Sequence, residues 1–159
     1  MVEIKKNIKL SQNIQTLIGD IGEKQVLLRL AIYCHGTNWN VFNNLGESGY
    51  DLLLQNNVTS DRVRIEVKTR QKLFTTGKKK TRYQFMLTDI EYKSCDFLIA
   101  YVIDSNDFYI VPKKELKPTS SNGNPKWRFT LGNINEESKS KNVKYRNVWD
   151  VLFAKIDND

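Results

Sequence analysis

Polar and apolar residues alternate strictly along residues 62–70, RVRIEVKTR. Val63, Ile65 and Val67 point to one side, and the residues between them are charged. This period of two predicts a half-buried β-strand, because successive side chains of a strand face opposite ways. Glu66 and Lys68 therefore share the polar face, about 7 Å apart along the strand.

A second strand is predicted immediately upstream, at residues 50–55. The residues between the two runs, NNVTSD at 56–61, have the composition of a turn. If the strands pair antiparallel, Asp51 comes level with the far end of the second strand. The predicted hairpin therefore gathers Asp51, Glu66 and Lys68.

The remaining pattern predicts helices on the faces of a sheet. Asp20 is placed to cap a helix from Ile21 to about Cys34, which Gly36 ends. The apolar run at 97–103 predicts a buried strand. Further strands are expected at 39–42 and 108–111, an extended segment at 83–87 and a short helix at 88–95. The order α-β-β-β-α-β-β predicts an α/β fold with a mixed central β-sheet flanked by helices.

The C-terminal part has weaker signals. Residues 118–126 have loop composition, 126–131 suit a strand, and 136–145 are charged and loop-like. The aromatic segment 147–156 is expected to pack on the body, with a subunit interface as the alternative. The predicted organisation is a basic lead-in at 1–16, a core at 17–117 and an extension at 118–159 that packs on the core.

Length and composition favour one globular domain. The chain has 159 residues, of which 40% are hydrophobic, enough for a proper core. It contains neither an apolar run long enough for a membrane span nor a signal peptide. Cys34, Cys95 and a single histidine do not suffice for a usual zinc site. We expect both cysteines to be reduced and the protein to be cytoplasmic.

Positive charge is concentrated in one segment. The chain carries a formal net charge of +7, while residues 62–82 hold nine Lys or Arg and one Glu, a net of +8. Such a cluster suits a phosphate backbone, although a solubilising loop is the alternative. The predicted nucleic-acid contacts are Arg70, Lys72, Lys78, Lys79, Lys80 and Arg82.

The hairpin residues suggest a reaction. Carboxylates are hard oxygen ligands for a divalent metal, and a lysine nearby can act on a phosphate or a water. Asp51, Glu66 and Lys68 therefore predict metal-dependent hydrolysis of a phosphodiester. The alternative for Glu66 and Lys68 is an ordinary solvated strand face.

These motifs resemble those of the PD-(D/E)XK nuclease superfamily. GYDLLL contains Asp51 at the first acidic position, without the proline, and RIEVKTR contains Glu66-Val67-Lys68. Upstream, GDIGEKQVLLRLAIYCHG is similar to a first helix that often carries a glutamate where Glu23 stands. Downstream, residues 83–117 resemble the later strand, helix and strand pair, so the similarity spans roughly residues 17–117.

The resemblance implies a restriction-endonuclease-like core and a DNA endonuclease. It implies Mg²⁺, for which Mn²⁺ can substitute, held by Asp51, Glu66, the carbonyl of Val67 and Glu23. Lys68 is expected to orient water or stabilise developing charge. For Glu23 a helix-capping pair with Asp20 is equally consistent.

Three functions remain open at this point. The first is a site-specific restriction-type or homing-type endonuclease, and the second is a Holliday junction resolvase. The third is a non-catalytic nucleic-acid-binding protein on the same fold. Because cutting two strands usually needs two active sites, a homodimer or tetramer is expected.

Overall fold

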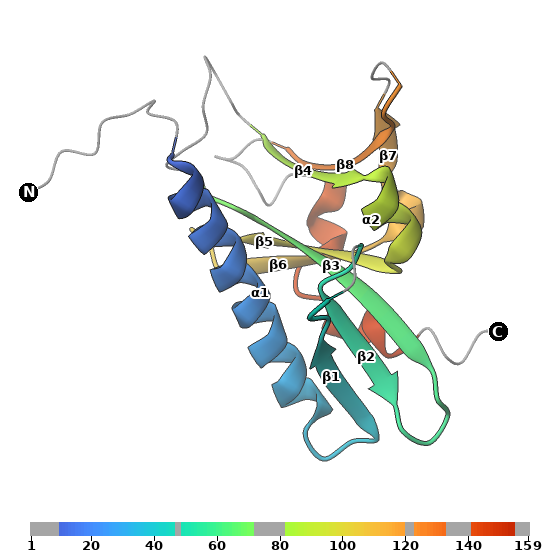
Figure 1. The fold of residues 1–159 in the computed structure, drawn as a ribbon. Helices are drawn as coiled ribbons and strands as arrows, with labels where there is room; N and C mark the ends of the chain where they lie inside the picture. Colours follow the sequence, from blue (N-terminus) through green and yellow to red (C-terminus); the bar gives the residue numbers. More distant parts are fainter. Residues whose placement is uncertain (1–9, 47–48, 72–81, 120–122, 133–140, 155–159) are drawn as a thin grey trace, which may run out of the picture.

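The computed structural model describes residues 10–46, 49–71, 82–119, 123–132 and 141–154. A five-stranded sheet has the strand order β1-β2-β3-β5-β6, and a three-stranded sheet has the order β4-β8-β7. Figure 1 shows helix α1 along one side of the larger sheet, with the smaller sheet on the other side. The prediction of an α/β fold with a mixed sheet flanked by helices is confirmed.

Helix α1 (Gln12–Cys34) is longer than predicted. Its N-cap is Ser11, whose hydroxyl accepts a hydrogen bond from the backbone N–H of Ile14 at 3.4 Å. The predicted cap at Asp20 is therefore wrong, since Asp20 lies inside the helix. The predicted end is correct, and Gly36 follows it with a φ of +75°, which glycine adopts without strain.

The predicted hairpin forms the centre of the larger sheet. β2 (Leu52–Asn56) pairs antiparallel with β3 (Arg62–Arg70), and Leu52 lies opposite Ile65. β1 (Trp39–Asn43) pairs antiparallel with the other edge of β2. β3 pairs in parallel with β5 (Phe97–Val102), which pairs antiparallel with β6 (Asp107–Pro112).

The smaller sheet is not part of the predicted arrangement. β4 (Tyr83–Thr88) is extended as expected, but it pairs with β8 (Lys126–Leu131) instead of joining the central sheet. β8 in turn pairs with β7 (Lys117–Thr119), part of which was predicted as loop. The short helix α2 (Asp89–Ser94) connects β4 to β5.

Two hydrophobic clusters cover the two faces of the larger sheet. On one face, Val26 and Leu30 of α1 pack with Ile65 of β3. On the other face, Leu98 of β5 packs with Phe85 and Phe129 of the smaller sheet. Burial on both faces explains why all six residues of β5 are buried and why its sequence is continuously apolar.

The C-terminal residues add short 3₁₀ helices, η4 (Lys141–Tyr145) and η5 (Trp149–Leu152), after η2 (Lys113–Glu115). Trp149 is 4% exposed, and the centroid of its ring lies 5.1 Å from that of Phe108. Cys34 and Cys95 are buried free thiols. Within the described ranges, no helix is both long and apolar enough to cross a membrane.

Candidate active site

Asp51 is held by hydrogen bonds immediately before β2. Its backbone N–H donates to the carbonyl of Ile65 at 2.8 Å, and its own carbonyl accepts from the N–H of Asn44 at 2.9 Å. Its carboxylate Oδ2 accepts from the N–H of Val67 at 2.7 Å. The hairpin therefore holds the side chain of Asp51 against β3, as its register requires.

Glu66 and Lys68 lie on the face of β3 opposite Ile65 and Val67. Glu66 is 3% exposed, although a carboxylate is rarely buried without a partner. The partner is Lys68, whose Nζ lies 2.6 Å from Oε1 of Glu66. The predicted grouping of Glu66 with Lys68 is therefore present in the structure.

Glu91 is a further member of this cluster that the sequence analysis missed. Its Oε1 accepts from Nζ of Lys68 at 2.8 Å. Its Oε2 accepts from the N–H of Thr88 at 2.7 Å, in a capping box at the start of α2. The spacing Thr88-x-x-Glu91 is a sequence signal for the cap, but the contact with Lys68 depends on how α2 packs.

The buried carboxylates share an unfavourable environment. Burial, and next the charge of Asp51, raises the pKa of Glu66 to about 8, although Lys68 opposes the shift. Burial also raises the pKa of Asp51. The cluster therefore retains a proton at neutral pH, because two close carboxylates do not both ionise readily.

The pKa values of Lys68 and Glu91 shift in the directions that favour their charged forms, unlike those of Asp51 and Glu66. Burial alone would lower the pKa of Lys68, but Glu66 and Glu91 outweigh it and raise that pKa. Burial would raise the pKa of Glu91, but hydrogen bonds from Lys68 and Thr88 lower it. Lys68 and Glu91 are thus both stabilised in their charged forms.

Glu23 is brought toward this cluster by a close contact between α1 and β3. A Cβ at Gly22 would stand 2.9 Å from Cβ of Thr69 and nearer still to its hydroxyl, so only glycine fits. Burial, and next the charge of Asp51, raises the pKa of Glu23. The capping alternative for Glu23 is wrong, because Asp20 is not a helix cap.

The donor set fits a divalent metal. An added cation favours the ionised forms of Asp51 and Glu66, whose pKa values burial raises. Within the described ranges, no three His, Cys, Asp or Glu side chains form a metal-binding group. Mg²⁺ is commonly held by one or two carboxylates, with water and phosphate completing its shell. The residues thus fit an open site built on Asp51 and Glu66.

The structure describes two of the six predicted nucleic-acid contacts, Arg70 and Arg82. Lys72, Lys78, Lys79 and Lys80 lie outside the described residues. Arg82 is exposed and immediately precedes β4. Arg70 donates from Nε to the carbonyl of Gln84 at 3.0 Å, so it links β3 to β4.

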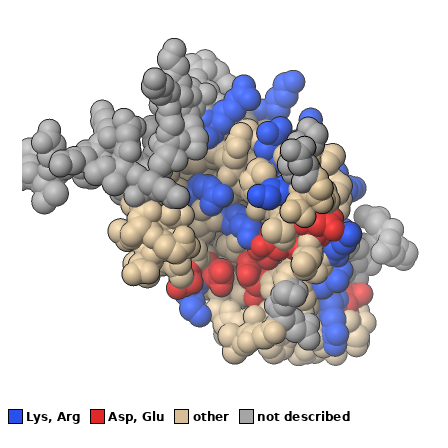
Figure 2. Space-filling model, turned by 45° about the horizontal axis from the view of Figure 1, so that its top comes forward, with Lys and Arg blue, Asp and Glu red and all other residues tan. Residues whose placement is uncertain are grey.

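The outer face of the smaller sheet is basic. The buried residues Phe85, Phe129 and Leu131 point inward, and the exposed residues alternate with them. Lys117 lies opposite Arg128 across the β7–β8 pair. Figure 2 shows Lys and Arg gathered over the upper part of the molecule, next to a band of acidic side chains. The alternation Lys126-Trp127-Arg128-Phe129 was a signal for this surface that the sequence analysis did not use. Its exposed basic residues are Arg82, Lys117, Lys126 and Arg128.

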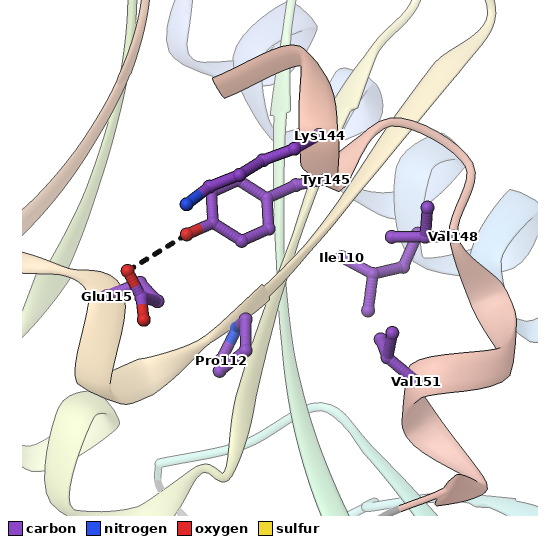
Figure 3. Close-up of a pocket in the computed structure, with 7 residues that line it drawn as sticks. All are labelled: Ile110, Pro112, Glu115, Lys144, Tyr145, Val148 and Val151. Atoms are coloured by element: carbon purple, nitrogen blue, oxygen red, sulfur yellow. Dashed lines mark hydrogen bonds between the residues drawn. The ribbon is translucent and has the colours of Figure 1, made fainter. Parts of the chain in front are cut away.

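A cavity of about 260 Å³ lies elsewhere, between β6 and the C-terminal 3₁₀ helices. Figure 3 shows its mostly apolar wall and the hydrogen bond of 2.9 Å from the hydroxyl of Tyr145 to Glu115. None of the acidic cluster residues lines it. The cavity is therefore separate from the candidate active site.

Comparisons with known proteins agree with this geometry. A bacterial homing endonuclease, I-Ssp6803I, superposes with a TM-score of 0.57 at 21% identity, covering 91% of this chain and 92% of its own. Hjc, a Holliday junction resolvase from the archaeal hyperthermophile Archaeoglobus fulgidus, gives a TM-score of 0.50 at 12% identity, covering 79% and 91%. No curated protein matches the sequence significantly. At these identities the two structures show a common fold.

The fold is a mixed α/β sheet whose central hairpin brings Asp51 together with Glu66 and Lys68, between helix α1 and a second sheet. The model of the PD-(D/E)XK endonuclease family matches residues 14–152. The chain belongs to this family, and the resemblance seen in the sequence is confirmed.

Proposed function

We propose that the protein is a metal-dependent DNA endonuclease whose active site is formed by Asp51, Glu66 and Lys68. The observation that carries the proposal is a pair of hydrogen bonds on β3. The N–H of Val67 donates to the carboxylate of Asp51, and the ammonium of Lys68 donates to the carboxylate of Glu66. The family membership supplies the reaction class, hydrolysis by an endonuclease.

Each residue has a distinct role in the proposed site. Asp51 and Glu66 hold Mg²⁺, or Mn²⁺ in its place, with the carbonyl of Val67 as a further ligand. The ion supplies a more acidic water and neutralises charge on the phosphate. Lys68 orients that water or stabilises the charge that develops on the phosphate. Glu23 binds the ion or one of its waters, which agrees with the influence of Asp51 on its pKa.

DNA is the proposed substrate. The exposed basic face of the smaller sheet and the Lys-rich residues 78–80 would contact phosphates, which carry most of the affinity in such complexes. Arg70 and Lys72 are the remaining proposed contacts. A site-specific enzyme of the restriction or homing type is the first candidate, because the homing endonuclease superposes over more of the chain. A Holliday junction resolvase is the second.

An assembly of two or four copies is part of the proposal, since each copy has one site and a duplex has two strands. A surface for a second copy is offered by α1, whose outer side carries exposed aliphatic residues. The two buried free thiols favour a reducing compartment, so a cytoplasmic location is proposed.

The test is cleavage of plasmid DNA and of a four-way junction by purified protein with Mg²⁺ or Mn²⁺. Asp51→Ala and Glu66→Ala should each abolish cleavage while DNA binding persists. Lys68→Ala should lose most activity but still bind metal, because lysine is not a ligand. Cutting at the wild-type rate by the Asp51 or Glu66 variant would contradict the site. Binding without any cleavage by the wild-type protein would favour the non-catalytic alternative.

A further inference from the structure

One ammonium group serves two carboxylates in the site. Nζ of Lys68 lies 2.6 Å from Glu66 and 2.8 Å from Glu91. Under the proposed function Glu66 has a second task, as a metal ligand. If Glu66 were the only partner of Lys68, the lysine and the metal would compete for one carboxylate.

Glu91 is anchored independently of Glu66. Its second carboxylate oxygen is held by the N–H of Thr88 at 2.7 Å. The next residue, Tyr92, stacks on Trp127 of β8 with ring centroids 3.6 Å apart and planes 8° from parallel. These contacts fix α2 against the smaller sheet, so Glu91 stays in place whatever Glu66 binds.

We propose that Glu91 is a positioning residue, which holds Lys68 in the active site when Glu66 binds the metal. The inference rests on the proposed function. In the bound state Lys68 is held by Glu91 and remains directed at the water or phosphate. No other described acid contacts the ammonium of Lys68 within salt-bridge distance.

The first experiment compares Glu91→Gln with the wild-type protein in Mn²⁺-dependent DNA cleavage. Glutamine can still accept from Thr88, but it loses the charge that holds Lys68. The maximal rate should fall about tenfold to a hundredfold, the range for a lost charged hydrogen bond, with little change in KM for DNA. Glu91→Asp, which keeps the charge on a shorter side chain, should recover part of the rate.

The matched control is Thr88→Ala. It removes the hydroxyl that accepts from the N–H of Glu91 at 3.3 Å but leaves the contact between Glu91 and Lys68. This variant should melt at a lower temperature and cut at close to the wild-type rate. If it slowed cleavage as much as Glu91→Gln does, a role in helix capping alone would explain both, and the inference would fail.

The second experiment measures Mn²⁺ affinity by calorimetry and does not require activity. Glu91→Gln should weaken Mn²⁺ binding when Lys68 is present, because Lys68 then competes with the metal for Glu66. The loss of affinity should be roughly fivefold smaller when Lys68→Ala is also present, because that competition is absent. Equal effects in the two backgrounds would overturn the inference. If the wild-type protein cut no DNA, the proposed function would fail, whereas this cycle would still decide whether Glu91 and Lys68 act together.

Discussion

Burial raises the pKa of Glu66 to about 8, which disfavours ionisation of its carboxyl group at neutral pH. Metal binding requires the carboxylate form, so a proton competes with the metal below that pH. We predict that affinity for Mn²⁺ rises about tenfold per pH unit from pH 6 to pH 8 and levels off above. Calorimetry at pH 7 in buffers of different ionisation enthalpy should show release of about one proton. An affinity independent of pH would contradict this assignment.

The same group should limit stability at alkaline pH. The ordinary pKa of Glu66 is 4.5, so between that value and about 8 the folded protein holds a proton that the unfolded chain lacks. Stability therefore falls as pH rises through this window. Glu66→Gln should stabilise the fold by about 1–2 kcal/mol at pH 8 and much less at pH 5. Chemical denaturation at both values tests this, with Asp150→Asn, an exposed acid, as the control.

Among individual residues, those whose position depends on local geometry are predictable from the sequence. Alternation and one hairpin turn suffice to place Asp51 beside Glu66 and Lys68, since strand period and antiparallel pairing are local rules. Glu91 approaches Lys68 only because α2 is stacked on a strand that comes later in the chain. A contact of that kind has no local signal.

At the element scale, Gly22 controls how closely α1 approaches β3. In an exposed helix Gly→Ala stabilises by about 1 kcal/mol, but at Gly22 the new methyl would meet Thr69. We predict that Gly22→Ala destabilises the fold by about 1–3 kcal/mol and slows cleavage, because Glu23 moves with the helix. Gly19→Ala, where nothing lies within 4 Å, is the matched control and should be neutral or stabilising. Similar melting temperatures for the two variants would refute the close contact.

The smaller sheet should supply affinity for DNA without sequence specificity. Lys126→Ala with Arg128→Ala should flatten the dependence of log K on log salt by about 0.9 for each lost phosphate contact. Preference among sequences should change little, because phosphate contacts do not distinguish bases. Lys141→Ala, an exposed lysine on η4, provides the control. An unchanged salt slope in the double variant would remove this face from the DNA interface.

The elements themselves were largely predictable, and their pairing was less so. β2, β3 and β5 follow from apolar patterns that reflect burial on one or both faces. β4 and β8 have equally clear patterns, but their pairing joins Tyr83 to Leu131 across intervening elements. The start of α1 was misplaced because Asp20 and Ser11 are both suitable caps, and the helix continues through the exposed residues 12–17 as far as Ser11.

At the scale of the whole molecule, α1 presents an apolar stripe to solvent. Ile14, Leu17, Ile21, Leu28 and Ile32 are 41–64% exposed and lie along one side of a helix about 34 Å long. We predict a dimer through this stripe, with a mass twice the 18.5 kDa of the chain by light scattering. Leu28→Glu should yield monomers and nicks in place of double-strand breaks. Val58→Glu, at an exposed apolar residue in the β2–β3 turn, should leave the mass unchanged, and a monomeric wild-type protein would exclude the interface.

The order of elements along the chain has a consequence for synthesis. Asp51, Glu66, Lys68 and Glu91 all precede β5, the parallel partner of β3, and β8, the partner of β4. Non-local pairings of this kind form slowly, and only after the later strands exist. A growing chain on the ribosome therefore contains these four proposed site residues before β5 and β8 can pair. We therefore expect no cleavage by the nascent chain until residues 126–131 have emerged and β8 has paired with β4.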